Sequence, residues 1–127
     1  MQLTFTVAHM LVRVTGVLLL ILGLLFWTGD ARGLIPVHML LGVLLVLSLW
    51  LLAAVASQLG APAGMVAGAA VLGLIVAGLG FSQTSLLPGS GHWIIQVLHL
   101  LVGMAAIAIA EVIGGRLRRN RLAASTA

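Results

Sequence analysis

The chain has 127 residues, of which 62 % are hydrophobic and 6 % are charged, and its mean hydropathy is +1.29. These values exclude an ordinary soluble domain and indicate an integral membrane protein of one domain, because four membrane-crossing helices of about 20 residues use most of the chain. The absence of cysteine excludes disulfides, thiolate metal sites and thiol catalysis.

The first predicted membrane span covers residues 3–27. An arginine precedes its apolar run, as in a signal peptide, but the run is long for that purpose, and the polar turn after it, residues 28–33, lacks an A-x-A-like cleavage site. We therefore expect an uncleaved helix. Within it, His9 and Arg13 lie one helical turn apart, and an arginine inside a membrane needs a partner of opposite charge.

The second predicted span, residues 35–58, begins with Pro36 at a position that suits the first turn of a helix. The third, residues 62–81, is rich in glycine and alanine, which allow helices to approach closely in a membrane. This small-residue face suits packing inside the bundle or against a second copy in a homodimer. Residues 82–91, which include Pro88 and two glycines, are predicted to form a loop.

The fourth predicted span, residues 92–115, precedes a basic tail, residues 116–127, that holds four of the six arginines. Such clusters flank membrane spans on the cytoplasmic side, and the pattern is typical of a membrane surface rather than of a nucleic-acid interface. With four spans, both termini are then cytoplasmic, in a multi-pass protein of the cytoplasmic (inner) membrane. The predicted fold is all-α, a four-helix bundle with up-down-up-down topology.

A short pattern recurs in the second and fourth spans. Each contains a histidine, three apolar residues and a glycine, namely His38 and Gly42 in one span and His99 and Gly103 in the other. The repetition suggests a duplicated helical hairpin, whose equivalent residues lie at equal depth, here toward the outer leaflet. In such a bundle the second and fourth helices are parallel and diagonal, so inward histidines at equal depth face each other across the core.

This arrangement suits a haem b with His38 and His99 as axial ligands, because neutral imidazole is a good ligand for iron. Gly42 and Gly103 follow the histidines on the same helix faces and would leave room for the flat macrocycle. A simpler interpretation is that membrane histidines only hydrogen-bond between helices, which stabilises the packing by about 1 kcal/mol or less. The matched contexts, in a chain with few other polar groups, favour haem.

A second polar cluster is predicted in the cytoplasmic half of the bundle. Arg13 lies ~21 Å from Trp27 and Glu111 lies ~18 Å beyond His99 at a rise of ~1.5 Å per residue, so the two charges share one depth. We expect an ion pair with His9 beside it. The cluster is either structural or part of a quinone pocket, a proton route or a second haem site in which Arg13 meets a propionate.

His92 lies two turns before His99 and nearer to water. We expect it to be an interfacial residue, a contact of a haem propionate or a replacement ligand opposite His38. A second haem lacks a clear pair of ligands, because His99 lies ~15 Å from His9 along the membrane normal. The number of haems, one or two, stays open.

The histidines on spans one, two and four resemble those of bacterial four-helix b-type cytochromes, in which such residues bind haem and exchange electrons with quinones. In the two-haem members of that group the two histidines of the fourth span are farther apart than His92 and His99, which puts a second haem in question. Residues 9–16 also resemble the H-R-x-T-G region in the first span of succinate dehydrogenase cytochrome b anchors. That resemblance implies a quinone-site role for Arg13.

The preferred hypothesis is a membrane-embedded cytochrome for electron transfer that is linked to quinone and has an unidentified redox partner. Whether it is an electron carrier or a quinol-linked oxidoreductase stays open. The alternative is a cofactor-free helical anchor or accessory subunit of a larger membrane complex. A small transporter or proton channel needs a polar path, and Ser48 is the only polar residue in the middle of the second span.

Overall fold

The computed structural model describes residues 1–126, apart from the side chains of residues 121, 124 and 126. This part of the chain forms four long helices and one short 3-10 turn that follows the first of them. The elements are α1 (Gln2–Trp27), η1 (Arg32–Leu34), α2 (Ile35–Gln58), α3 (Ala63–Ser82) and α4 (His92–Thr126). The predicted all-α class is therefore confirmed, and the four predicted spans begin within two residues of the observed helices.

The fourth helix is longer than the predicted span. We expected it to end before Arg116, but α4 continues through the basic tail to Thr126. No proline or glycine follows Gly115, and arginine, leucine and alanine are strong helix formers. The arginines of the tail are thus carried on an extension of the helix that crosses the bilayer.

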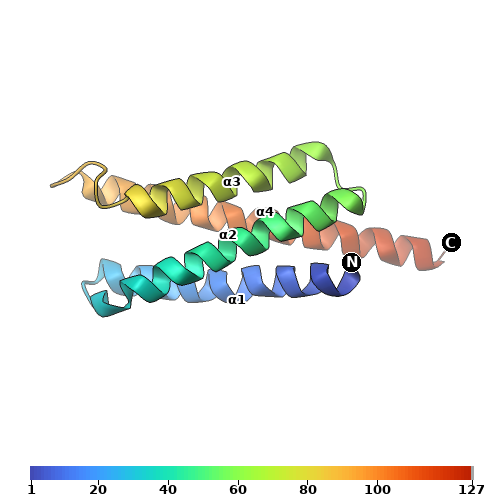
Figure 1. The fold of residues 1–127 in the computed structure, drawn as a ribbon, viewed down its shortest axis with the longest axis horizontal. Helices are drawn as coiled ribbons and strands as arrows, with labels where there is room; N and C mark the ends of the chain where they lie inside the picture. The colour runs from blue at the N-terminus through green and yellow to red at the C-terminus, as the bar shows by residue number, and fades with distance from the viewer. Residues whose placement is uncertain (127) are drawn as a thin grey trace.

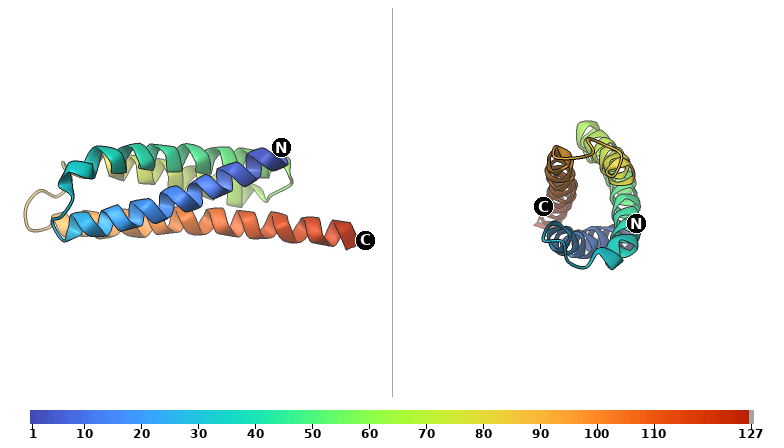
Figure 2. Two further views of the ribbon diagram at one scale, coloured as in Figure 1. Left: turned by 90° about the horizontal axis from the view of Figure 1, so that it is seen from below. Right: turned by 90° about the vertical axis from the view of Figure 1, so that its left-hand side faces the viewer.

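The helices form an antiparallel bundle in which each neighbour in sequence is also a neighbour in space (Figures 1 and 2). The second helix packs against α1 and α3, while α4 packs against α3 and α1 and meets α2 across the bundle. Both termini lie at one end, and the loops that follow α1 and α3 lie at the other (Figure 1). This is the predicted up-down-up-down topology, with α2 and α4 parallel.

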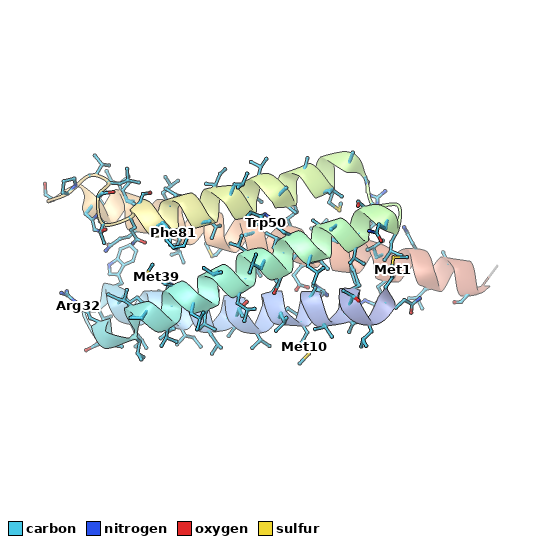
Figure 3. All side chains as sticks on the ribbon, in the orientation of Figure 1. Met1, Met10, Arg32, Met39, Trp50 and Phe81 are labelled. Atoms are coloured by element: carbon cyan, nitrogen blue, oxygen red, sulfur yellow. The ribbon has the colours of Figure 1, made fainter. Side chains whose placement is uncertain are left out.

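A narrow apolar core runs through the bundle, and apolar side chains also cover its outside. The largest fully buried side chains are Val12, Leu49, Leu52 and Ile113. Leucine, isoleucine and valine side chains project outward from all four helices, and Met10 points away from the bundle (Figure 3). Because all four helices are long and apolar enough to cross a bilayer, this outer surface is the lipid-facing surface of a multi-pass membrane protein.

Glycines on α3 allow the close helix contacts expected from its composition. A Cβ atom at Gly73 would overlap the indole ring of Trp50, which lies between α2 and α3 (Figure 3). The same indole donates a hydrogen bond from Nε1 to the carbonyl oxygen of Ala70 at 3.2 Å. A Cβ atom at Gly68 would lie 3.0 Å from Cδ1 of Ile109 on α4. The small-residue face of α3 is therefore used, at least in part, inside the bundle.

This packing predicts opposite effects for two alanine substitutions on α3. Gly73→Ala should lower the free energy of unfolding by about 1–3 kcal/mol, because the added methyl group displaces the indole of Trp50. Gly78→Ala should leave stability unchanged or raise it by up to about 1 kcal/mol, because nothing lies within 4 Å of its Cβ position. Thermal unfolding of both variants in one detergent compares them directly, and equal losses would contradict the contact.

Candidate functional site

Two histidines face each other across the bundle near the end that carries the loops following α1 and α3. His38 lies in the first turn of α2, and His99 lies two turns into α4. Their ring centroids are 6.4 Å apart, with an interplanar angle of 51°. The structure thus brings together the two residues that the repeated H-x-x-x-G pattern selected, because α2 and α4 are parallel and the histidines occupy the same level.

The hydrogen bonds divide the four histidines into two groups. The Nδ1 atoms of His38 and His99 are buried and have no hydrogen-bond partner among the described residues. By contrast, Nε2 of His9 lies 3.1 Å from Oε1 of Glu111, and Nδ1 of His92 donates to the carbonyl oxygen of Leu86 at 3.2 Å. An unpaired buried polar atom is costly, by about 1–3 kcal/mol. His38 and His99 therefore differ from the other two histidines in having a buried Nδ1 atom that no described residue satisfies.

The walls around the facing histidines come from α1 and α3. The ring of Phe26 meets His38 edge-on, with ring centroids 5.3 Å apart. A Cβ atom at Gly23 would lie 3.9 Å from Cε1 of His38, and one at Gly80 would lie 3.4 Å from Cε1 of His99. The ring of His38 thus lies beside a glycine of α1, and the ring of His99 lies beside a glycine of α3.

Sequence patterns did not identify Gly23, Gly80 or Phe26. All three lie in spans where glycine and apolar residues are common. Which of them faces a histidine depends on how far each helix is rotated about its axis, and a uniformly apolar span carries no periodicity from which that rotation can be read.

The glycines that follow the histidines border open space. Gly42 and Gly103 are half-buried, and a Cβ atom at either position would meet nothing within 4 Å. We predicted that these glycines leave room beside the histidines. Neither glycine is in a close helix contact, so the space beside them is compatible with a flat group next to the ring pair.

The second polar cluster joins α1 to α4 farther along the bundle. Arg13 donates from Nε to Oε1 of Glu111 and from its second guanidinium nitrogen to Oε2, both at 2.6 Å. His9 approaches the same carboxylate at 3.1 Å and is only 13 % exposed. Two parallel charge-assisted bonds are the strongest geometry available to an arginine and a carboxylate. The predicted ion pair between Arg13 and Glu111 is confirmed, and His9 contacts the same carboxylate.

A glycine makes this cluster sterically possible. A Cβ atom at Gly114 on α4 would overlap the imidazole of His9, with Nε2 only 2.7 Å away. Any larger residue would push His9 away from Glu111. Gly114 was not predicted, and the only sequence signal for it is its position three residues after the sole acidic residue in the fourth span.

The first residue of α4, His92, has a local structural contact. It is half-buried, and its bond to the backbone of Leu86 ties the start of α4 to the preceding loop. His99, rather than His92, presents the ring that faces His38. The structure does not bring His92 opposite His38 as a replacement ligand. Among the described residues there is also no group of three or more histidine, aspartate or glutamate side chains that would hold a metal ion.

The fold and the two clusters define the class as a four-helix multi-pass membrane protein with a facing histidine pair and a separate interhelix ion pair. Comparison of the chain with protein-family models, curated proteins and solved structures finds no match.

Proposed function

We propose that this protein is a membrane-embedded cytochrome that binds haem b between His38 and His99 and transfers electrons in exchange with a quinone. The observation that supports this proposal is that two imidazoles face each other at a centroid distance of 6.4 Å, with buried Nδ1 atoms that have no hydrogen-bond partner among the described residues. We propose one haem, because His9 contacts Glu111 and His92 contacts the backbone of Leu86.

The distance between the rings agrees with ligation of one metal ion from two sides. A bond from a metal to an imidazole nitrogen is about 2 Å long, so two imidazoles on opposite sides of one ion have ring centres roughly 6 Å apart. Two imidazoles in direct van der Waals contact have a similar separation, about 4.5–7 Å for an aromatic pair. The unpaired nitrogen atoms favour ligation, because a metal bond uses a lone pair that is otherwise unsatisfied in a dry environment.

In this proposal the haem supplies one-electron redox chemistry, and the chain supplies ligands, orientation and a low-dielectric surrounding. His38 and His99 hold the iron from two parallel helices. Phe26 and the apolar walls exclude water, while Gly23 and Gly80 let the imidazoles lie close to α1 and α3. Burial of the site away from water is one of the factors that set a haem's redox potential.

We further propose that the arginine-rich end of α4 faces the cytoplasm. Arg116, Arg118 and Arg119 are exposed on the helical extension, and such residues favour the cytoplasmic side of the inner membrane. Both termini then lie in the cytoplasm, because they share one end of the bundle (Figure 1). The haem would lie toward the outer leaflet, and quinone reaches it from the bilayer.

The second candidate function is that of a cofactor-free helical anchor or accessory subunit. It is favoured by the His9 contact, which shows that this chain uses a histidine to link two helices by a hydrogen bond. In that case His38 and His99 would serve only as packing residues.

A visible spectrum of the purified protein separates the two functions. The cytochrome proposal predicts a b-type reduced-minus-oxidised difference spectrum and about one haem per chain. Well-folded protein that shows no b-type signal, after expression with an adequate haem supply, would contradict it and favour the anchor.

The glycine beside His99 allows a sharper test of the site. Gly80→Leu should lower the haem content at least several-fold, because the side chain would occupy the space of the His99 ring. Gly78→Leu is the matched control, since its Cβ position borders open space on the same helix. Haem per polypeptide and the melting temperature are measured for both variants. Equal haem contents in two folded variants would mean that the His99 ring beside Gly80 does not hold the haem.

A further inference from the structure

Two hollows on the surface of the bundle meet at Arg13. The first has a volume of about 220 Å³ and is lined by polar and charged side chains together with one aromatic residue, namely Phe5, Thr6, His9, Arg13, Gly114 and Arg118. The second has a volume of about 310 Å³ and is almost wholly apolar, lined by Arg13, Val14, Val17 and Leu18. Because Arg13 borders both, the two hollows are neighbours, and we call them together the groove, with a polar end and an apolar end.

The polar end carries a positive charge, that of Arg118, which no carboxylate of the described residues neutralises. Glu111 accepts both hydrogen bonds of Arg13 and also contacts His9. The chain contains only one other acidic residue, Asp30. It lies in the loop after α1 and accepts a hydrogen bond from the hydroxyl group of Thr28. Within the described residues Arg118 therefore has no carboxylate partner, and its charge is available to an anion from outside the chain.

The orientation of the groove matches the direction of the bilayer. Arg118 lies seven residues beyond Glu111, which is about 10 Å nearer to the end of the bundle that carries the termini. Val14, Val17 and Leu18 extend from Arg13 in the opposite direction, toward the middle of α1. The polar end thus lies near the membrane surface and the apolar end within the hydrocarbon.

We propose that this groove binds one anionic phospholipid, with its phosphate beside Arg118 and His9 and one acyl chain along Val14, Val17 and Leu18. Basic pockets between membrane helices bind anionic lipid headgroups because the phosphate supplies the missing charge. A neutral lipid or a quinone would fill the apolar end equally well but would leave Arg118 unbalanced. The site is separate from the histidine pair, so it does not depend on haem binding.

The test is lipid binding to the purified full-length protein, followed by its melting temperature in detergent. Phosphatidylglycerol should raise the melting temperature, whereas phosphatidylcholine and inorganic phosphate should not. Arg118→Gln should weaken the apparent affinity for phosphatidylglycerol about five-fold, the effect of one arginine near an anionic lipid. Arg119→Gln is the matched control, because its guanidinium lies against Gly115 rather than in the hollow, and it should change the affinity less than two-fold.

A second pair of variants tests the apolar end without changing the charge. Val17→Trp should fill the groove and weaken phosphatidylglycerol binding, while Val7→Trp, on the same helix but outside both hollows, should not. The proposal is overturned if Arg118→Gln and Arg119→Gln weaken binding equally, since the attraction would then be diffuse. It is also overturned if inorganic phosphate reproduces the effect, or if a quinone stabilises wild type and Arg118→Gln alike and displaces the lipid.

Discussion

Replacing either His38 or His99 with leucine is expected to remove haem from the protein. Each imidazole occupies one side of the proposed site, and leucine has a similar size but no lone pair. The haem content should fall from about one per chain to below about 0.1 in either variant, because a haem iron depends on its axial ligands. The measurement is the reduced-minus-oxidised spectrum, normalised to protein, of the purified variants.

Two other histidines serve as controls for this experiment. His92→Leu removes a bond to the loop before α4, and His9→Leu removes a bond to Glu111. Neither residue faces the ring pair, so both variants should keep their haem. Retention of haem in a folded His38→Leu or His99→Leu protein would show that this pair is not the ligand set. Loss of haem in all four variants would point to misfolding.

Replacing Glu111 with glutamine is expected to destabilise the bundle more than any other polar substitution in the spans. Arg13 would lose the carboxylate that accepts both of its hydrogen bonds, and an unpaired arginine within a membrane is strongly unfavourable. A drop in melting temperature of roughly 5 °C or more is expected for a chain of this size. His9→Gln should have a smaller effect, because His9 contributes a single 3.1 Å contact.

The double variant Arg13→Gln/Glu111→Gln provides the control for Glu111→Gln. Removing both charges leaves no unpaired ion, so the double variant should be more stable than Glu111→Gln alone. This non-additivity is the signature of a direct interaction. If the effects of the two single substitutions add, the ion pair does not contribute to stability.

Several features of the molecule were predictable because they depend on distance along a helix. Four runs of apolar residues define the spans, since backbone groups in a bilayer must be satisfied within each helix. The pairing of Arg13 with Glu111 followed from the fixed rise per residue, which places both at one depth. The facing of His38 and His99 followed in the same way from two equivalent positions on parallel helices.

Other features depend on the rotation of each helix and on which side chains meet. The contacts of Gly23, Gly80 and Gly114 with histidine rings lie in this group, as does the bond between His92 and Leu86. Spans that are apolar on all sides carry little amphipathic signal, so their sequence does not indicate which face turns inward. The length of α4 was also underestimated, because hydropathy reports where a helix leaves the bilayer and not where it ends.

Hydropathy and helical rise are properties of the chain itself, and they alone established the four spans, the depth of each polar residue and the candidate histidine pair. Helix rotation and the distances between helices are set by packing between segments far apart in the sequence. Only the tertiary structure therefore showed that the buried Nδ1 atoms of His38 and His99 lack a hydrogen-bond partner among the described residues and that His9 contacts the ion pair. The groove at Arg13 likewise exists only once α1 and α4 are packed together.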